Sequence, residues 1–227
     1  KTIIIPGTCK IIGEKAFANN KTLEKVIIQD GVEIIDKQAF SECDNLTTVK
    51  MADSVTKIGN SAYYFCLKLS SINLSKKLSN LGIMAMHKTA IEEIEIPEGI
   101  TEIKENTFSR CEKLERVVLP KSVEKIANSA FSDCASLTNI EIDESNKNFK
   151  FKEEILMNAE ENEMLIILPS AIKGDTFVVP DRVVKLNSNQ LEIYPQIKTI
   201  TIPKSVTEIA PEFINKNITK VNITENE

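Results

Sequence analysis

Apolar and polar residues recur along the chain with a period of about 23 residues. One copy of the repeated unit occupies residues 114–134 and reads LERVVLPKSVEKIANSAFSDC, and other copies begin at Leu23, Leu46 and Leu137. Each copy opens with the segment L-x-x-V-x-I, whose apolar positions alternate at its end as they do in a half-buried strand. The pattern therefore predicts one strand per unit. The proline that often follows would end that strand, because proline has no N–H to donate.

Two further segments complete each unit. The spacing V-x-x-I, as in Val123 and Ile126, predicts a second, short extended piece. The segment from Asn128 to Cys134 places a small and a large apolar residue next to each other, and its spacing predicts a single helical turn. A unit of this size cannot bury its own apolar side, so neighbouring units have to stack.

The register of the repeat is kept over most of the chain, which predicts a solenoid with a parallel sheet on one face. The residue after the strand recurs in steps of 23, except for one step of 22, at Pro6, Gln29, Ala52, Ser75, Pro97, Pro120 and Asp143, and the series resumes at Pro180 and Pro203. Eleven positions later stands an aromatic or large apolar residue, expected in the core, at Phe17, Phe40, Tyr63, Met86, Phe108, Phe131, Leu191 and Ile214.

Residues 143–179 break the period. Lys150–Met157 and Met164–Leu168 have the apolar content of strands, and the polar segment Asn158–Asn162 separates them. We expect an inserted β-hairpin on a loop side of the solenoid, the alternative being an irregular charged loop. No linker rich in Gly, Pro or Ser divides the chain. The prediction is one domain over residues 1–227, with regular repeats in 1–142, the irregular repeat in 143–179 and C-terminal repeats in 180–227.

Composition and charge argue against two classes of function, nucleic-acid binding and membrane insertion. The net charge of −5 and the pI of about 5.2 argue against nucleic-acid binding and give no polybasic membrane anchor. There is no apolar run of the length of a membrane span, so direct membrane insertion is not expected. The chain opens KTIIIPG, without a signal peptide or an initiator Met, and we interpret it as a piece of a longer protein.

The repeat pattern L-x-x-V-x-I-P-x-S-V-x-x-I-x-x-x-A-F-x-x-C resembles that of the BspA-like, or treponema-type, leucine-rich repeat family over essentially the whole chain. The segment EEILMNAEENEMLIILP resembles a hairpin that interrupts many members, although Glu154 and Leu168 stand where Gly and Tyr are common. The resemblance implies a right-handed leucine-rich-repeat solenoid. It also implies a secreted or cell-surface protein of bacteria or protists, in a family partly associated with adhesion to host or matrix proteins and without common catalytic residues.

Cysteine and histidine are the residues that invite a chemical role. One column of the repeat holds Cys43, Cys66, Cys111 and Cys134, and Cys9 stands in the column of Val123. We interpret all five as structural thiols that replace apolar core residues, with a disulfide between neighbouring repeats as the alternative. No C-x-x-C or Cys/His cluster predicts a metal. His87, the single histidine, is expected in a surface loop and completes no catalytic triad. The sequence therefore predicts no enzyme, no cofactor and no metal.

The sheet face is the remaining candidate for function. In each strand, two positions beside the central apolar residue should point away from the core, and ten strands would give a face roughly 45 Å long. We predict that a monomer uses this face to bind a protein partner, such as a host or extracellular-matrix protein; the alternatives are an intracellular scaffold and a targeting segment of an enzyme. The candidate binding face consists of Lys25, Thr48, Lys50, Ser71, Asn73, Glu93, Glu95, Arg116, Val118, Asn139, Glu141, Thr199, Thr201, Lys220 and Asn222.

Overall fold

The structure is a computed structural model that describes residues 1–187, 191–192, 194–214 and 216–224. Contacts divide the chain into two compact units, Lys1–Asn146 and Lys147–Glu227. The boundary falls inside the segment 143–179, where the sequence loses its period. The single domain expected over residues 1–227 stays a prediction.

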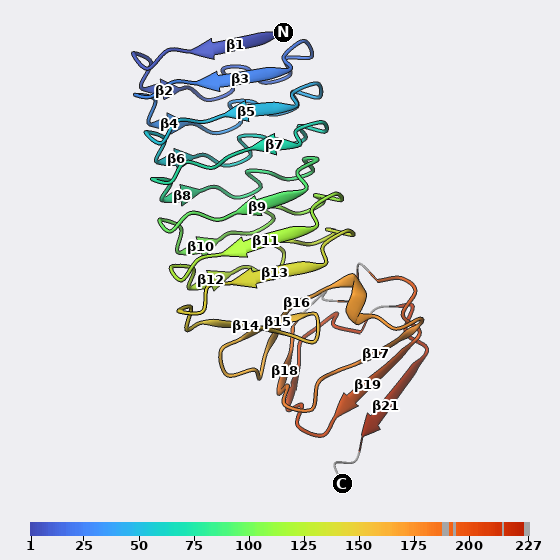
Figure 1. Cartoon of the computed structure of the whole chain (residues 1–227). Coiled ribbons are helices and arrows are strands. Elements are labelled where there is room, and N and C mark those ends of the chain that lie inside the picture. The colour runs from blue at the N-terminus through green and yellow to red at the C-terminus, as the bar shows by residue number, and fades with distance from the viewer. Residues whose placement is uncertain (188–190, 193, 215, 225–227) are drawn as a thin grey trace. The chain divides into compact units, whose positions relative to one another are not determined.

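The first unit is a stack of repeats whose longer strands pair in parallel, as predicted. Residues one period apart are register partners: Ile3 pairs with Val26, and Val26 pairs with Val49. Figure 1 shows these strands as successive rungs. They are β1 (Thr2–Ile5), β3 (Lys25–Ile28), β5 (Thr48–Lys50), β7 (Ser71–Ile72), β9 (Glu93–Glu95), β11 (Arg116–Leu119) and β13 (Asn139–Ile142).

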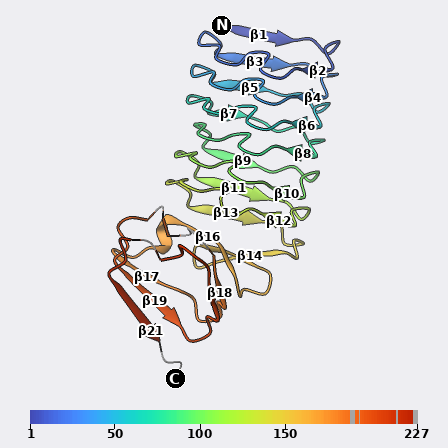
Figure 2. The same cartoon turned by 180° about the vertical axis from the view of Figure 1, so that it is seen from behind.

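A second column of two-residue strands confirms the short extended piece of each unit. The strands pair in the orders β2-β4-β6-β8 and β10-β12, all in parallel, and Figure 2 shows them from behind. They are β2 (Ile11–Ile12), β4 (Ile34–Ile35), β6 (Lys57–Ile58), β8 (Asn80–Leu81), β10 (Glu102–Ile103) and β12 (Lys125–Ile126).

The expectation of one continuous ten-strand sheet is wrong. The described long strands form three sheets, β1-β3-β5-β7, β9-β11-β13 and, in the second unit, one of three strands. The break between β7 and β9 coincides with the single step of 22 residues. In a full repeat, a turn closes through the N–H of Leu114, which donates to Cys111 O at 3.0 Å. In the short repeat Ile91 follows Thr89 by two residues instead of three, and the N–H of Ala90 donates to Leu69 O instead.

The predicted helical turns are also wrong. The N–H of Ser41 donates to Gln38 O, three residues back, whereas the N–H of Phe40 donates to Ala62 O of the next repeat at 2.8 Å. Gln38 and Glu42 have φ of 55° and 57°, outside the right-handed helical region. Alternate N–H groups therefore leave the segment, and it forms consecutive β-turns. The one helix among the described residues is a short 3₁₀ helix, η1 (Pro169–Ala171).

The predicted aromatic column forms the core of the first unit. Phe40 is fully buried and stacks on Phe17 and Tyr63, with ring centroids 5.2 and 5.4 Å apart. Phe108 and Phe131 stack in the same way at 5.3 Å. Because each ring covers the next, the stack buries apolar surface that a single repeat would leave in water.

The second unit begins with three antiparallel strands, so the predicted hairpin is a meander. The strands are β14 (Phe149–Lys152), β15 (Ile155–Asn158) and β16 (Met164–Ile167), in that order. The predicted strand Lys150–Met157 is split at Glu153 and Glu154, whose φ values of 52° and 64° make a tight turn. The polar turn is confirmed, since Asn158 Oδ1 accepts the N–H of both Asn162 and Glu163 at 3.1 Å.

Parallel pairing resumes after the meander. The long strands pair in the order β17-β19-β21 and the short ones as β18-β20. In this unit Phe213 is fully buried and Ile214 is 40% exposed, so the predicted core position is one residue off. The period shortens here: Lys185 pairs with Glu208, 23 positions on, but Thr199 pairs with Lys220, only 21 positions on, and Phe213 lies between these two registers. The strands are β17 (Thr176–Val178), β18 (Lys185–Leu186), β19 (Thr199–Pro203), β20 (Glu208–Ile209) and β21 (Lys220–Thr224).

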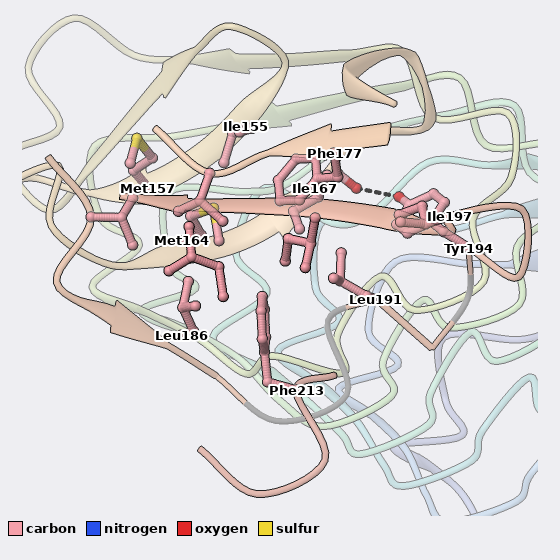
Figure 3. Packing of buried hydrophobic residues seen from close by; sticks show 14 residues of the cluster. Ile155, Met157, Met164, Ile167, Phe177, Leu186, Leu191, Tyr194, Ile197 and Phe213 are labelled. Carbon is pink, nitrogen blue, oxygen red and sulfur yellow. Dashed lines mark hydrogen bonds between the residues drawn. The ribbon is translucent and has the colours of Figure 1, made fainter. Parts of the chain in front are cut away.

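One apolar cluster joins the meander to the parallel strands of the second unit. Figure 3 shows Met164 and Ile167 of β16 packed with Phe177, Leu186 and Phe213. The hydroxyl of Tyr194, buried at the edge of the cluster, donates to Ile167 O. The meander is therefore a structural layer of this unit.

Candidate binding face on the parallel sheet

The residues of the candidate binding face lie where the alternation placed them. None of the fifteen is buried, whereas Val117, between Arg116 and Val118, is fully buried. Eleven belong to the first unit and four, Thr199, Thr201, Lys220 and Asn222, to the second. Register places Glu93, Arg116 and Asn139 in one row and Glu95, Val118 and Glu141 in the next.

Arg116 connects three strands of this face. Its Nε and Nη2 atoms donate to the two carboxylate oxygens of Glu141, both at 2.7 Å, and its Nη1 donates to Glu93 at 3.3 Å. The amide of Asn139 also donates to Glu141, at 3.0 Å. These hydrogen bonds raise the pKa of Arg116 and lower the pKa of Glu141. A bidentate pair has a defined geometry, so the guanidinium is held in one orientation on an otherwise exposed surface.

Two hollows flank this ion-pair network. The first, of about 370 Å³, lies where the ladder is broken, between Ile72 and Asn73 on one side and Glu93 and Ile94 on the other. The second has a volume of about 530 Å³. Its lining is Lys76, Glu95, Ile96, Pro97, Glu98, Val118, Leu119, Pro120, Glu141, Ile142 and Asp143.

Lys76 and Pro97 line both hollows and are residues that the sequence reasoning missed. The signal for them was the single 22-residue step. A shortened repeat interrupts the ladder, and the first hollow lies at that interruption. The strand pattern alone points to outward positions on strands, so it passes over side chains in the loops that follow the strands.

A third hollow, of about 1110 Å³, lies within the second unit. It is bordered by the meander turn at Glu153 and Glu154, by Lys173, and by Val178 and Arg182 near β17. Its charges are mixed in sign, and none of the fifteen predicted residues lines it.

Four of the five cysteines are buried structural thiols, and the alternative of a disulfide is wrong. All five are free, and the four that share a column are buried. Each of those four donates its S–H to the backbone carbonyl of the core residue one repeat earlier, as Cys66 does to Phe40 O at 3.0 Å. Burial raises the pKa of Cys66 and raises that of Cys111 to about 11. Cys9 differs, since it is only half-buried.

His87 is not a plain surface-loop residue. It is half-buried, stacks on Tyr64 at 5.0 Å, and its Nδ1 lies 2.6 Å from Ser109 Oγ. Desolvation, with smaller effects from Arg110 and Lys88, lowers its pKa. Within the described part of the chain, no three His, Cys, Asp or Glu residues are grouped as metal ligands.

Comparison with known proteins agrees with this architecture. The family model for the BspA type leucine rich repeat region matches in six copies, over residues 1–115, 33–163 and 113–227. The chain belongs to the BspA-type leucine-rich repeat family. No curated protein matches it.

Solved structures share the fold at low sequence identity. A leucine-rich repeat protein from Eubacterium ventriosum aligns with a TM-score of 0.80 and 22% identity, over 97% of this chain and 63% of that protein. One from Bacteroides ovatus gives 0.63 and 22%, over 98% and 69%. The pneumococcal vaccine antigen PcpA gives 0.56 and 19%, over 97% and 50%. The chain therefore spans less than two thirds of the first and half of the last.

No helix among the described residues has the length and apolar content to cross a bilayer.

Proposed function

We propose that this repeat chain is a non-enzymatic binding module of a secreted or cell-surface protein, and that it serves adhesion through the sheet face of the first unit. The observation that carries the proposal is the Arg116 network, held on a parallel ladder between two hollows. Family membership supports a surface location. A host or extracellular-matrix protein is the kind of partner we propose.

The mechanism rests on a preorganised surface. Strands β9, β11 and β13 are paired along their length, so few backbone degrees of freedom remain to be lost on binding. The second hollow combines apolar lining from Val118 and Pro120 with the carboxylates of Glu95 and Glu141. A partner side chain can enter the hollow while polar groups around it set its orientation, which is the usual division of an interface into core and rim.

Charge substitution in the second hollow tests the proposal. The double variant Glu95→Arg/Val118→Arg should reduce binding to purified matrix proteins or fixed host cells by about tenfold or more, because both side chains line the hollow. Its melting temperature should stay within about 2 °C of the wild type, since neither residue is buried. Surface plasmon resonance and calorimetry measure the two quantities.

The matched control carries the same change of charge at β10 and directly before β12, in the column of short strands. Glu102 and Glu124 are both exposed and line none of the three hollows described. The variant Glu102→Arg/Glu124→Gln should bind as the wild type does. If both variants lose binding equally, the change in net charge is the cause. If neither variant loses binding, the sheet face is not the binding surface.

A further inference from the structure

The two residues that follow the core aromatic residue, or Met86 in the fourth repeat, form a row along the turns of the first unit. In five of the six repeats this pair contains no aromatic residue other than His87, and in the remaining repeat it is Tyr64–Phe65. The pairs are Ala18–Asn19, Ser41–Glu42, Tyr64–Phe65, His87–Lys88, Ser109–Arg110 and Ser132–Asp133.

Tyr64, Phe65 and His87 lie in contact across two repeats. The ring centroids of Tyr64 and Phe65 are 4.4 Å apart, and His87 lies 5.0 Å from the first and 5.5 Å from the second. Lys88 Nζ stands 4.7 Å from the centroid of the Phe65 ring, a cation–π contact. We call Tyr64, Phe65, Leu67, His87 and Lys88 the aromatic patch.

The fold does not require aromatic residues at this position. The N–H of Phe65 donates to His87 O at 3.0 Å, and the N–H of Glu42 makes the equivalent bond to Tyr64 O at 2.7 Å. The N–H of Arg110 makes it to Ser132 O, also at 2.7 Å. The same turn therefore forms with a polar pair of residues.

Phe65 occupies an unfavourable backbone conformation for a bulky residue. Its φ is 56°, in the left-handed region that this position of the turn also takes in other repeats, at 57° for Glu42 and 58° for Lys88. The region is least favourable for a bulky side chain. Its ring is only half-buried, and Leu67, two residues on, is 45% exposed. The chain thus keeps apolar groups partly in water at a strained position where a polar residue would fold as well. A partly exposed aromatic pair, placed where the other repeats carry polar residues, points to a role in recognition.

The charges around the patch define its partner. Lys88 belongs to the patch, Lys68 follows Leu67 in sequence, and Arg110 follows Lys88 in the row, where it pairs with Asp133 at 3.3 Å. Glu42, whose N–H donates to Tyr64 O, is the carboxylate that precedes Phe65 in the row. The chain as a whole is acidic, with a net charge of −5. Rings and cations together complement an apolar side chain that is flanked by carboxylates.

We infer that the aromatic patch is a second docking surface, for a protein segment that presents an apolar side chain between acidic residues. None of its residues lines the hollows of the sheet face or the third hollow. It is therefore independent of the proposed adhesive face, and either surface can fail its test without the other.

The single histidine supplies a direct reporter. The imidazole resonances of His87 are the only ones of their kind in the chain and arise inside the patch. Titration with a short peptide of alternating Leu and Glu should shift them in a saturable way. The same peptide with Lys in place of Glu, or Ser in place of Leu, should shift them about tenfold less at equal concentration.

Two variants separate recognition from folding. The variant Tyr64→Ser/Phe65→Asn introduces residue types found in the row at Ser41 and Asn19. It should lower the affinity for the Leu–Glu peptide by about tenfold. If that variant does not fold, Lys68→Glu/Lys88→Glu keeps the rings and should weaken it by a similar factor. Glu42→Asn removes a carboxylate one repeat earlier in the row and should not weaken binding. Glu95→Arg/Val118→Arg, on the sheet face, should bind as the wild type does.

Four outcomes would contradict the proposal that the aromatic patch binds an acidic apolar segment. Unchanged His87 resonances throughout the titration, or equal binding of the wild type and the variants, would overturn the proposal. Equal binding of the Glu and Lys peptides would also overturn it. So would a response to neutral oligosaccharides or to anionic vesicles in place of the peptide, because the patch would then recognise another class of ligand.

Discussion

At the scale of the residue, position in the repeat decides the role of a side chain. In the aromatic column Phe40, Tyr63 and Met86 are all fully buried, since each buries apolar surface against the repeats on both sides. The sequence predicted the burial of Cys43, Cys66, Cys111 and Cys134 for this reason. It could not predict hydrogen-bond partners, because those come from the repeat before or after and depend on the path of the turns.

The buried hydroxyl of Tyr63 makes a testable contribution to stability. It is fully buried in the aromatic column, where Phe40 and Phe108 stand in other repeats, and its hydroxyl has no hydrogen-bond partner among the described residues. Tyr63→Phe removes a buried, unpaired polar group and should raise the free energy of unfolding in urea by about 1 kcal/mol. As a control, Tyr194→Phe loses the hydrogen bond to Ile167 and should lower it by about 1 kcal/mol. A destabilised Tyr63→Phe variant would show that the hydroxyl is satisfied in solution.

At the scale of the element, the sequence predicts the strands correctly but not the turns between them. Strand columns follow from alternation, which is a local property. The turn after each short strand looked helical because Ala and Phe are adjacent, yet residues at positive φ and bonds to the next repeat replace the helix. A local pattern cannot reveal that an N–H group donates to a residue more than 20 positions away.

The shortened repeat offers a direct test of what breaks the sheet. Inserting one Asn between Thr89 and Ala90 restores the three-residue spacing of the other repeats. The turn N–H should then donate as in the repeat of Leu114, and β9 should pair with β7. Hydrogen exchange at Glu92 and Glu93 should slow, because new ladder bonds protect these amides. Unchanged exchange would mean that the spacing is not the cause of the break.

His87 makes the stability of the first unit depend on pH. Desolvation lowers its pKa in the folded state, where Arg110, Lys88 and Asp133 are the charged groups that act on it. The unfolded state therefore binds the proton more tightly, and stability falls as pH decreases through about 6.5, the ordinary pKa of histidine. Between about pH 7.5 and pH 5.5 the wild type should lose more melting temperature than His87→Gln, since Asp and Glu titrate mainly at lower pH. Parallel curves for the two proteins would contradict this origin.

At the scale of the whole molecule, the chain consists of two compact units with separate cores. In the first unit each repeat contacts mainly its neighbours, and in the second a meander and parallel strands share one apolar cluster. The sequence predicted an interruption at residues 143–179, and the meander strands β14, β15 and β16 lie within that segment. The predicted single strand Lys150–Met157 was wrong, because the turn that splits it is built from Glu153 and Glu154 and does not carry the glycine signal of a tight turn.

Core substitutions should therefore act locally. Phe177→Ala should cost about 3–5 kcal/mol, as truncation of a buried Phe does, and should speed hydrogen exchange in residues 147–224. Phe108→Ala, equally buried in the first unit, should do so in residues 1–146. Exchange that rises over the whole chain in both variants would show a single cooperative unit.

The sequence by itself determined the period, the strand columns, the inward residues and the family, because alternation and a constant repeat place like residues above one another. The tertiary structure decided the turn conformation, the break between β7 and β9, the pairing of Arg116 with Glu141 and the contact of Tyr64 and Phe65 with His87. Each of these depends on an interaction between residues in different repeats. Such an interaction has no local signature, since its partner is set by how the repeats stack.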